Sequence, residues 1–483
     1  MGQCQEAFGW DLTDGSHLGF AGGPRSGRTT ALRTLAGTLA ASFGPHELHL
    51  YAVHAGGLSA LSSLPHTAAL ASRTNIDHVE DVVKTLAERV SSRQETLARR
   101  GLASVAEQHH DCEATGGVPM PYLVLLVDGW EPLVEALAVV NYGRPVQDLL
   151  QLIPDGSAAG LRVVVTGERA LLAGQLSSIL TTRLILRVSD PMELALAGIP
   201  LKSVPHRQPP GRALHARDHR EIQIAVLGDD PTSGGQVEAL EQIGRDARSR
   251  WHSVDARSLP TPVRQLPRQV SLADVEGDPR WRFDGNHAGI GVGAGDLWPV
   301  GFDVAAGQRR ILVIGPPRSG RSTALVVLAR SLASGGRPVA VVGGWRVLPS
   351  VAPGSSGFLR AVGAGEVEDL VSLRRRHPEL ALVVDDAERL VGTALEAVVR
   401  EISRLADEDD GVVVAATSPT AMAAQPRGWH SELARARTGV LLCPTPAEGD
   451  LLGVRLSRPG ERLPGRGILV VGGDSRSIQV AQP

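Results

Sequence analysis

Residues 22–31 of the chain read GGPRSGRTTA, and residues 315–324 read GPPRSGRSTA. Each stretch follows a short apolar segment, HLGFA at 17–21 and ILVI at 311–314, and opens a run with helical spacing. A loop of the pattern G-x-x-x-x-G-[KR]-[ST] between a strand and a helix is the signature of a phosphate-binding P-loop. Because the pattern occurs twice in the same local setting, we interpret the chain as an internal duplication.

Further matches follow the two loops in the same order. They are YLVLLVDGW at 122–130 and LALVVDDAERL at 380–390, LRVVVTGE at 161–168 and GVVVAATS at 411–418, and PPGRAL at 209–214 and LPGRGI at 463–468. Continuous apolar runs that alternate with helical segments are typical of parallel sheets covered by helices on both faces. The predicted fold class is therefore α/β, with one mostly parallel sheet in each copy.

The duplication predicts two domains. We expect residues 1–255 to form the first, with a trailing helix, and residues 281–483 to form the second. Residues 256–280, which include LPTPVRQLP, predict an extended linker because their prolines fix an extended backbone. Copy one has a shorter segment ahead of its loop than copy two, so its N-terminal edge is expected to be trimmed. It also carries an insertion of about 36 residues between its loop and its strand-ending Asp.

Composition excludes several classes of protein. The chain has 483 residues, 49 of them basic and 52 acidic, which argues against a large basic face for nucleic acid. Its 3 cysteines are far apart and predict neither a disulfide framework nor a metal cluster. It contains no apolar run of the roughly 18 residues that a membrane span needs. We expect a cytoplasmic location, with recruitment to the inner face of the cell membrane as a further expectation.

The two loops are the predicted nucleotide sites, with ATP and Mg²⁺ as ligands. Backbone N–H groups of such a loop surround phosphate oxygens at a helix N-terminus, where the dipole favours anions. Hydroxyls of Thr29 and Ser322 are expected on Mg²⁺, and Asp128 and Asp385 are expected to hold the ion through water. The predicted nucleotide-binding residues are Gly22, Gly23, Pro24, Arg25, Ser26, Gly27, Arg28, Thr29, Thr30, Gly315, Pro316, Pro317, Arg318, Ser319, Gly320, Arg321, Ser322 and Thr323.

Both loops carry arginine, Arg28 and Arg321, where the pattern usually has lysine. Arg is longer and forked, and it does not substitute freely for a compact point charge. One interpretation is a site that binds nucleotide and turns it over poorly. The other is compositional, since the chain has 47 Arg and only 2 Lys. Both interpretations predict weak turnover and leave open whether the chain is an effective ATPase.

The candidate catalytic residues are Asp128, Asp385 and Asp386. A hydrolysing site usually has a carboxylate just beyond the metal-binding Asp to orient the attacking water. Copy one has Gly129 and Trp130 there, whereas copy two has Asp386. We therefore expect the first site to bind nucleotide and the second to be a slow enzyme.

Other polar residues carry weaker signals. Thr166 and Thr417 end the next strands, where they could act as γ-phosphate sensors or as capping hydroxyls. The basic run 374–377 is expected at a solvated helix end and the acidic run 407–410 in an exposed turn. The arginines of the two PGR turns, Arg212 and Arg466, need no explanation beyond the turn.

Several strings resemble the FtsK/SpoIIIE family of P-loop ATPases, and within it the last two ATPase domains of the EccC-type motor of type VII secretion. They are LHLYAVHAGGLSALSSLPH at 48–66, SSRQETLARRG at 91–101, LLVDGW, RVSDP at 187–191, PPGR and LLGVRLSRPGERLPGRGILV at 451–470. The resemblance implies tandem RecA-like P-loop NTPase domains. It also implies a motor or regulatory module in protein secretion, working beside a longer ATPase or in a self-assembled ring, with small helical secreted proteins as substrates.

Two other functions are alternatives to a secretion module. A DNA translocase of the same family would bind duplex DNA, which the near-neutral charge does not favour. A non-hydrolytic scaffold would retain the loops as relics. Binding of duplex DNA and binding of ATP with Mg²⁺ are the measurements that separate the three.

Overall fold

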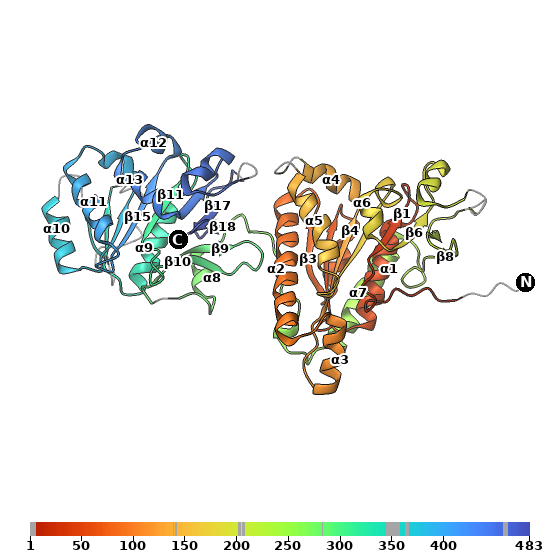
Figure 1. The fold of residues 1–483 in the computed structure, drawn as a ribbon. Helices are drawn as coiled ribbons and strands as arrows, with labels where there is room; N and C mark the ends of the chain where they lie inside the picture. Colours follow the sequence, from red (N-terminus) through yellow and green to blue (C-terminus); the bar gives the residue numbers. More distant parts are fainter. Residues whose placement is uncertain are drawn as a thin grey trace, which may run out of the picture. The chain divides into compact units, whose positions relative to one another are not determined.

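The computed structural model describes residues 6–138, 140, 143–200, 204, 208–282, 284–343, 358–362, 367–456 and 462–483. The chain forms two compact units, Met1–Arg264 and Gln265–Pro483 (Figure 1). Each unit is built around one sheet, as the duplication predicts, and each carries one of the two glycine-rich loops.

The first unit has an eight-stranded sheet in the order β3-β2-β4-β5-β1-β6-β7-β8. Its strands are β1 (Leu18–Ala21), β2 (Leu48–His54), β3 (Thr67–Ser72), β4 (Tyr122–Asp128), β5 (Leu161–Gly167), β6 (Thr182–Leu186), β7 (Arg212–His215) and β8 (Glu221–Gln223). Pairing is parallel from β3 to β6 and antiparallel for β7 and β8. The strand that precedes the loop, β1, lies between β5 and β6.

Helices cover both faces of this sheet (Figure 1). The helices are α1 (Arg28–Ser42), α2 (Ile76–Arg100), α3 (Val105–Thr115), α4 (Trp130–Ala138), α5 (Arg144–Asp155), α6 (Gln175–Ile179) and α7 (Ser233–Arg250). Alternate residues of β4 enter opposite cores: Leu125 packs in the core formed with α2, α4 and α5, whereas Val124 packs in the core formed with α1 and α7. Burial on both faces explains why the strands read as continuous apolar runs.

The second unit has a ten-stranded sheet in the order β10-β9-β18-β17-β16-β11-β15-β14-β12-β13. Its strands are β9 (His287–Gly293), β10 (Pro299–Asp303), β11 (Arg310–Ile314), β12 (Val339–Val342), β13 (Phe358–Val362), β14 (Ala381–Val384), β15 (Val412–Thr417), β16 (Thr438–Leu442), β17 (Arg466–Val471) and β18 (Asp474–Val480). The stretch from β16 to β13 is parallel, and the stretch from β10 to β16 is antiparallel. The antiparallel part adds the hairpin β9–β10, which lies ahead of the second loop.

The second unit repeats the layers of the first. Its helices are α8 (Leu272–Glu276), α9 (Arg321–Ser334), α10 (Val367–Arg376), α11 (Ala394–Leu405), α12 (Pro419–Ala424) and α13 (Trp429–Leu433). Helix α9 packs on one face with Val383, and α10, α11 and α13 pack on the other with Leu382. The result is two doubly covered α/β sheets, which confirms the predicted fold class.

The stretch predicted as an extended linker contains a short helix, α8. The Ser271 hydroxyl accepts a hydrogen bond from the Asp274 amide at 3.0 Å and so caps the helix N-terminus. Leu272 and Val275 are buried, which anchors this turn in the second unit. The residues before α8, where the prolines lie, contain a 3-10 turn at Ala256–Ser258 and no strand.

Among the described residues, no helix combines the length and the apolar character needed to cross a bilayer.

Acid is expected to destabilise the first unit through His17. The Val163 amide donates to Nδ1 of His17 at 3.1 Å. Burial, together with the nearby positive charge of Arg162, lowers the pKa of His17 to about 4. The unfolded chain has a histidine pKa near ~6.5, so the stabilisation is complete above that pH and is lost as the pH falls toward 4.

The loss amounts to about 3 kcal/mol of unfolding free energy. Denaturant unfolding of wild type and His17→Asn between pH 4 and 7 tests this, because Asn keeps an acceptor and does not titrate. The variant should show a shallower pH dependence, whereas His110→Asn, which changes an exposed side chain, should follow wild type. Parallel curves for all three proteins would contradict the assignment.

Candidate nucleotide-binding sites

The backbone of both loops turns in the same way. Arg25 and Gly27 have φ of 57° and 108°, and Arg318 and Gly320 have φ of 65° and 100°. Left-handed residues interleaved with right-handed ones turn successive N–H groups toward one side, which forms an anion-binding concavity. Helices α1 and α9 begin directly after these glycines, and neither has a capping side chain at its N-terminus. Their first-turn amides are therefore available to a phosphate group.

In each unit, the backbone of the PGR turn donates a hydrogen bond to the backbone of the P-loop. The Gly211 amide donates to the Ser26 carbonyl at 2.8 Å, and the Gly465 amide donates to the Ser319 carbonyl at 2.8 Å. These glycines belong to the two PGR turns, for which the sequence predicted no role beyond the turn itself. The P-loop and the turn thus form one duplicated unit, although the two partners are far apart in the sequence.

This contact explains the last loop glycine. A Cβ on Gly27 would lie 2.9 Å from the Gly211 nitrogen, and a Cβ on Gly320 would lie 2.9 Å from the Gly465 nitrogen. Any side chain there would also have to adopt a left-handed backbone conformation, which L-residues disfavour. Both positions therefore need glycine for backbone conformation and for close packing.

A hydroxyl and a carboxylate meet beside each loop. Thr29 Oγ1 lies 3.1 Å from Asp128 Oδ2, and Ser322 Oγ lies 2.9 Å from Asp385 Oδ2. The structure thus brings together, in each unit, the two residues that the sequence assigned to Mg²⁺. Hydroxyl and carboxylate oxygens are suitable donors for this hard cation, so the residues present fit it.

The surroundings of Asp385, the carboxylate beside the second loop, shift its pKa. Burial raises the pKa of Asp385, and the neighbouring charge of Asp386 acts in the same direction. Hydrogen bonds from Ser322 and from the Asp386 amide, the latter at 3.0 Å, partly oppose the shift. A cation beside Asp385 would favour its ionised form.

The signature arginines have different acidic partners. Arg28 Nη1 lies 3.4 Å from Glu168 Oε1, which follows β5. Arg321 Nη2 lies 3.5 Å from Asp386 Oδ1, which follows β14. Asp386 thus contacts the P-loop arginine of the second unit, and the first unit has Gly129 at the corresponding place.

In each unit, a glutamate shortly after the strand-ending Asp accepts hydrogen bonds from the end of the neighbouring strand or from the loop that follows it. Glu131 Oε1 accepts hydrogen bonds from the backbone amides of Glu168 and Ala170 at 2.8 and 3.1 Å. Glu388 Oε2 accepts from the Thr417 hydroxyl at 2.8 Å. Glu131 thus fixes the loop after β5, and Glu388 bonds the last residue of β15.

The two threonines that the sequence marked as sensors are fully buried and already have protein partners. The Thr166 hydroxyl donates to Asp128 Oδ1 at 3.0 Å and accepts from the Gly129 amide at 2.9 Å. The Thr417 hydroxyl donates to Glu388. Thr166 orients the Asp128 carboxylate, and contact of either threonine with a γ-phosphate stays a prediction.

One part of the first site was not foreseen from the sequence. A Cβ on Gly57 would lie 2.6 Å from Thr29 Cγ2 and 3.2 Å from Asp128 Oδ2, so the segment after β2 packs on the predicted Mg²⁺ ligands. Arg33 Nε donates to the Gly57 carbonyl at 2.8 Å and holds this segment in place. The glycine pair at 56–57 was the available signal, but a close approach to Thr29 is visible only in three dimensions.

Comparison with known proteins agrees with this geometry. Residues 3–212 match the FtsK/SpoIIIE family. The chain is 28% identical over 339 residues to ESX secretion system protein EccC of Thermomonospora curvata, covering 68% of this chain and 25% of that protein. It is 26% identical over 353 residues to ESX-1 secretion system protein EccCb1 of Mycobacterium tuberculosis, covering 69% of this chain and 56% of that one. The chain thus spans about a quarter to just over half of these two relatives.

Solved structures match nearly the whole chain. EccC of Thermomonospora curvata (ATPases 2 and 3), in complex with a signal sequence peptide, aligns at a TM-score of 0.69 and 25% identity, covering 100% of this chain and 91% of that one. EssC of Geobacillus thermodenitrificans (ATPases 2 and 3) has the same fold, with a TM-score of 0.71 at 19% identity over 97% of this chain and 92% of that one. The first unit therefore carries a domain of the FtsK/SpoIIIE family, and the whole chain is similar in sequence and fold to ATPases 2 and 3 of the EccC proteins.

Proposed function

We propose that the chain binds ATP with Mg²⁺ at both P-loops and acts as a weakly hydrolysing motor or regulatory module of a type VII-like protein secretion system. The observation that carries the proposal is the duplicated arrangement of uncapped loop, supporting turn, hydroxyl and carboxylate. The similarity to EccC proteins supports the secretion context.

Each site has its own set of residues for the ligand. Loop amides and the first turns of α1 and α9 would hold phosphate oxygens, and Thr29 with Asp128, or Ser322 with Asp385, would hold Mg²⁺. When bound, Mg²⁺ neutralises phosphate charge and so assists phosphoryl transfer. Because Asp386 lies beside Asp385 and Gly129 lies beside Asp128, we assign the turnover to the second unit.

Removing the metal tests whether the carboxylates serve Mg²⁺. We expect EDTA to lower the affinity for ATP by about tenfold or more, because the half-buried Asp128 and Asp385 would then face phosphate without a cation between them. Binding of a fluorescent ATP analogue with and without EDTA measures this. An unchanged affinity would show that the carboxylates do not act through a metal.

Replacing Arg321 by lysine tests the arginine itself. Arg321→Lys is expected to preserve or raise the affinity of the second site, because lysine supplies the compact charge that most P-loops use. Arg28→Lys is the matched variant in the first unit, and calorimetric affinities report both. A fall of about tenfold or more in Arg321→Lys would show that the arginine, with its contact to Asp386, is a selected feature of the site.

A scaffold without hydrolysis is the first alternative. It predicts nucleotide binding, or none, without phosphate release, whereas our proposal predicts slow Mg²⁺-dependent release. A phosphate-release assay with purified chain separates the two. Contamination is controlled with Asp385→Ala prepared in the same way.

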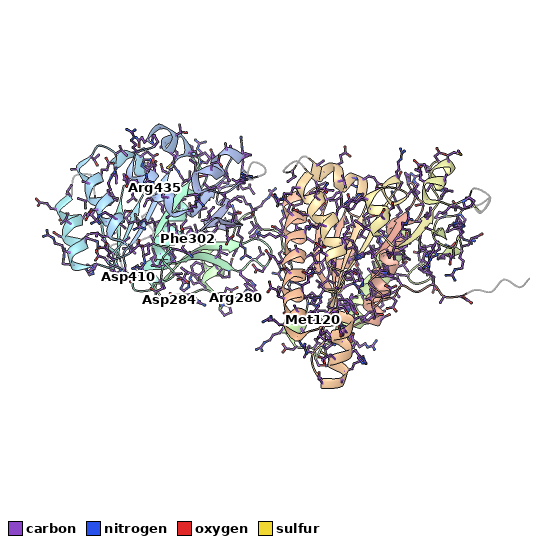
Figure 2. All side chains as sticks on the ribbon, viewed as in Figure 1. Met120, Arg280, Asp284, Phe302, Asp410 and Arg435 are labelled. Atoms are coloured by element: carbon purple, nitrogen blue, oxygen red, sulfur yellow. The ribbon has the colours of Figure 1, made fainter. Side chains whose placement is uncertain are left out.

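A DNA translocase is the second alternative, and internal ion pairs count against it. Arg374 of the predicted basic run pairs with Asp409 of the acidic run. Asp410 (Figure 2) pairs with Arg309 at 2.5 Å and Arg337 at 3.3 Å. The pair of Arg374 with Asp409 partly neutralises the basic run, and the pairs of Asp410 neutralise two further arginines of the unit. We expect no salt-dependent binding of duplex DNA at physiological ionic strength, and such binding in a filter or polarisation assay would favour the translocase.

We also propose that the chain works on the cytoplasmic side of a secretion complex, with a longer ATPase or with further copies of itself. The solved EccC structure contains a signal sequence peptide, which supports small helical secreted proteins as ligands of this chain. Fluorescence polarisation with signal-segment peptides of such proteins tests the ligand, and light scattering with and without ATP tests self-assembly. Nucleotide binding without any peptide binding would confine the proposal to an ATP-binding module.

A further inference from the structure

The arginine of the second PGR turn contacts a segment that its counterpart does not reach. Arg466 is 8% exposed, and its Nη2 donates to the carbonyls of Leu266 and Pro267 at 3.2 and 3.1 Å. These carbonyls belong to residues 265–270, the N-terminal arm of the second unit, here called the arm. A buried guanidinium that bonds backbone carbonyls favours their position, because moving them would remove two hydrogen bonds from a buried charge.

The arm is also attached to the sheet. Leu266 packs in a small core with Leu272, Val275 and Trp281. The Gln482 amide donates to the Val270 carbonyl at 2.9 Å. The arm is therefore held at one end by the last residues of the chain and at the other by Arg466.

The residue before Arg466 holds the P-loop. The Gly465 amide donates to the Ser319 carbonyl, and the Gly465 carbonyl accepts from the Val480 amide, both at 2.8 Å. Arg466 begins β17, and its own amide donates to the Leu463 carbonyl at 3.0 Å. Two consecutive residues of one tightly bonded turn thus contact the arm and the second P-loop.

The first unit shows that the turn does not require this contact. Arg212 occupies the same place, and its guanidinium donates to Gln223 Oε1 at 3.0 Å and Glu221 Oε2 at 2.9 Å, both on the adjacent strand β8. Gly211 still supports Ser26. The contact with the arm is therefore an addition in the second unit.

We propose that Arg466 is a positioning residue that couples the arm to the second nucleotide site. Docking of the arm on Arg466 holds Gly465 against Ser319 and favours the loop conformation that binds phosphate. Because coupling between two sites is reciprocal, nucleotide at the second loop must in turn strengthen the docking of the arm. This inference rests on the proposed nucleotide binding at the second unit.

Hydrogen exchange of the intact chain, with and without ATP–Mg²⁺, tests the coupling in both directions. In wild type, nucleotide should slow exchange of a peptide covering the arm as well as the peptide covering residues 315–322. In Arg466→Gln the arm should exchange faster without nucleotide, its response to nucleotide should vanish, and affinity at the second site should fall by about fivefold or more. Arg466→Lys should restore part of the response, and Arg212→Ala should leave the arm and the second site unchanged.

The possible results distinguish failure of the proposed function from failure of the proposed coupling. If wild type does not bind ATP–Mg²⁺ at the second loop, the proposed function and this inference both fail. If nucleotide protects residues 315–322 while the arm is unaffected, the function stands and the coupling is wrong. The wild-type comparison needs no variant, so it holds even if Arg466→Gln does not fold. A response of the arm that persists in a folded Arg466→Gln would assign the coupling to other contacts.

Discussion

Asp385→Ala is expected to remove most of the ATP turnover, by about 100-fold or more. The side chain of Asp385 lies 2.9 Å from the Ser322 hydroxyl, and it is the carboxylate that would hold Mg²⁺ beside the second P-loop. Asp386, the neighbouring acidic residue, contacts the P-loop arginine in the same unit. Losing Asp385 therefore removes the metal ligand at the site to which we assign hydrolysis.

Asp128→Ala is the matched control in the first unit. It deletes the equivalent carboxylate, which lies 3.1 Å from the Thr29 hydroxyl, but Gly129 supplies no neighbouring acid there. We expect it to weaken nucleotide binding in the first unit while costing little turnover. Steady-state phosphate release from the two variants measures the division, and equal losses would refute it.

Gly320→Ala should abolish nucleotide binding at the second loop, with an affinity loss of about tenfold or more. The new Cβ would sit 2.9 Å from the Gly465 nitrogen at a residue whose φ is 100°. The left-handed conformation alone disfavours alanine by roughly 1–2 kcal/mol. Relief of the contact must either move the PGR turn off Ser319 or change the direction of the loop amides.

Gly307→Ala separates backbone strain from this contact. Gly307 also has a positive φ, 87°, but a Cβ there would meet no atom within 4 Å. Both variants should lose thermal stability from strain, Gly320→Ala more because of its added contact with Gly465, and only Gly320→Ala should lose nucleotide. Calorimetric binding together with thermal unfolding makes the comparison. Retained affinity in Gly320→Ala would show that the loop and the turn do not act as one unit.

The fold was predictable because its signals are local. The P-loops, the strands that end in Asp128 and Asp385, and the repeated order of apolar runs all lie within short windows of sequence. The position of the antiparallel hairpin β9–β10 was harder to predict from the sequence, because β9 pairs with β18 and these strands lie near opposite ends of the second unit's sequence. The short helix α8 was not predicted, because the prolines that precede it indicated an extended linker.

The closeness of the P-loop hydroxyl to the strand-ending carboxylate was predictable, whereas the contacts around this pair were not. Thr29 and Asp128 were paired correctly because the motif carries their relation. The support of Ser26 by Gly211 joins residues far apart in the sequence, and a PGR turn looks like any other turn until the chain is folded. The different partners of Arg212 and Arg466 likewise depend on which segment lies beside each turn.

Isothermal titration of the intact chain with ATP–Mg²⁺ tests the central claim most directly, namely that both duplicated loops are nucleotide sites. We predict two binding events per chain, of which Gly27→Ala removes one and Gly320→Ala removes the other. Absence of binding in wild type, or binding that survives in the double variant, would contradict it.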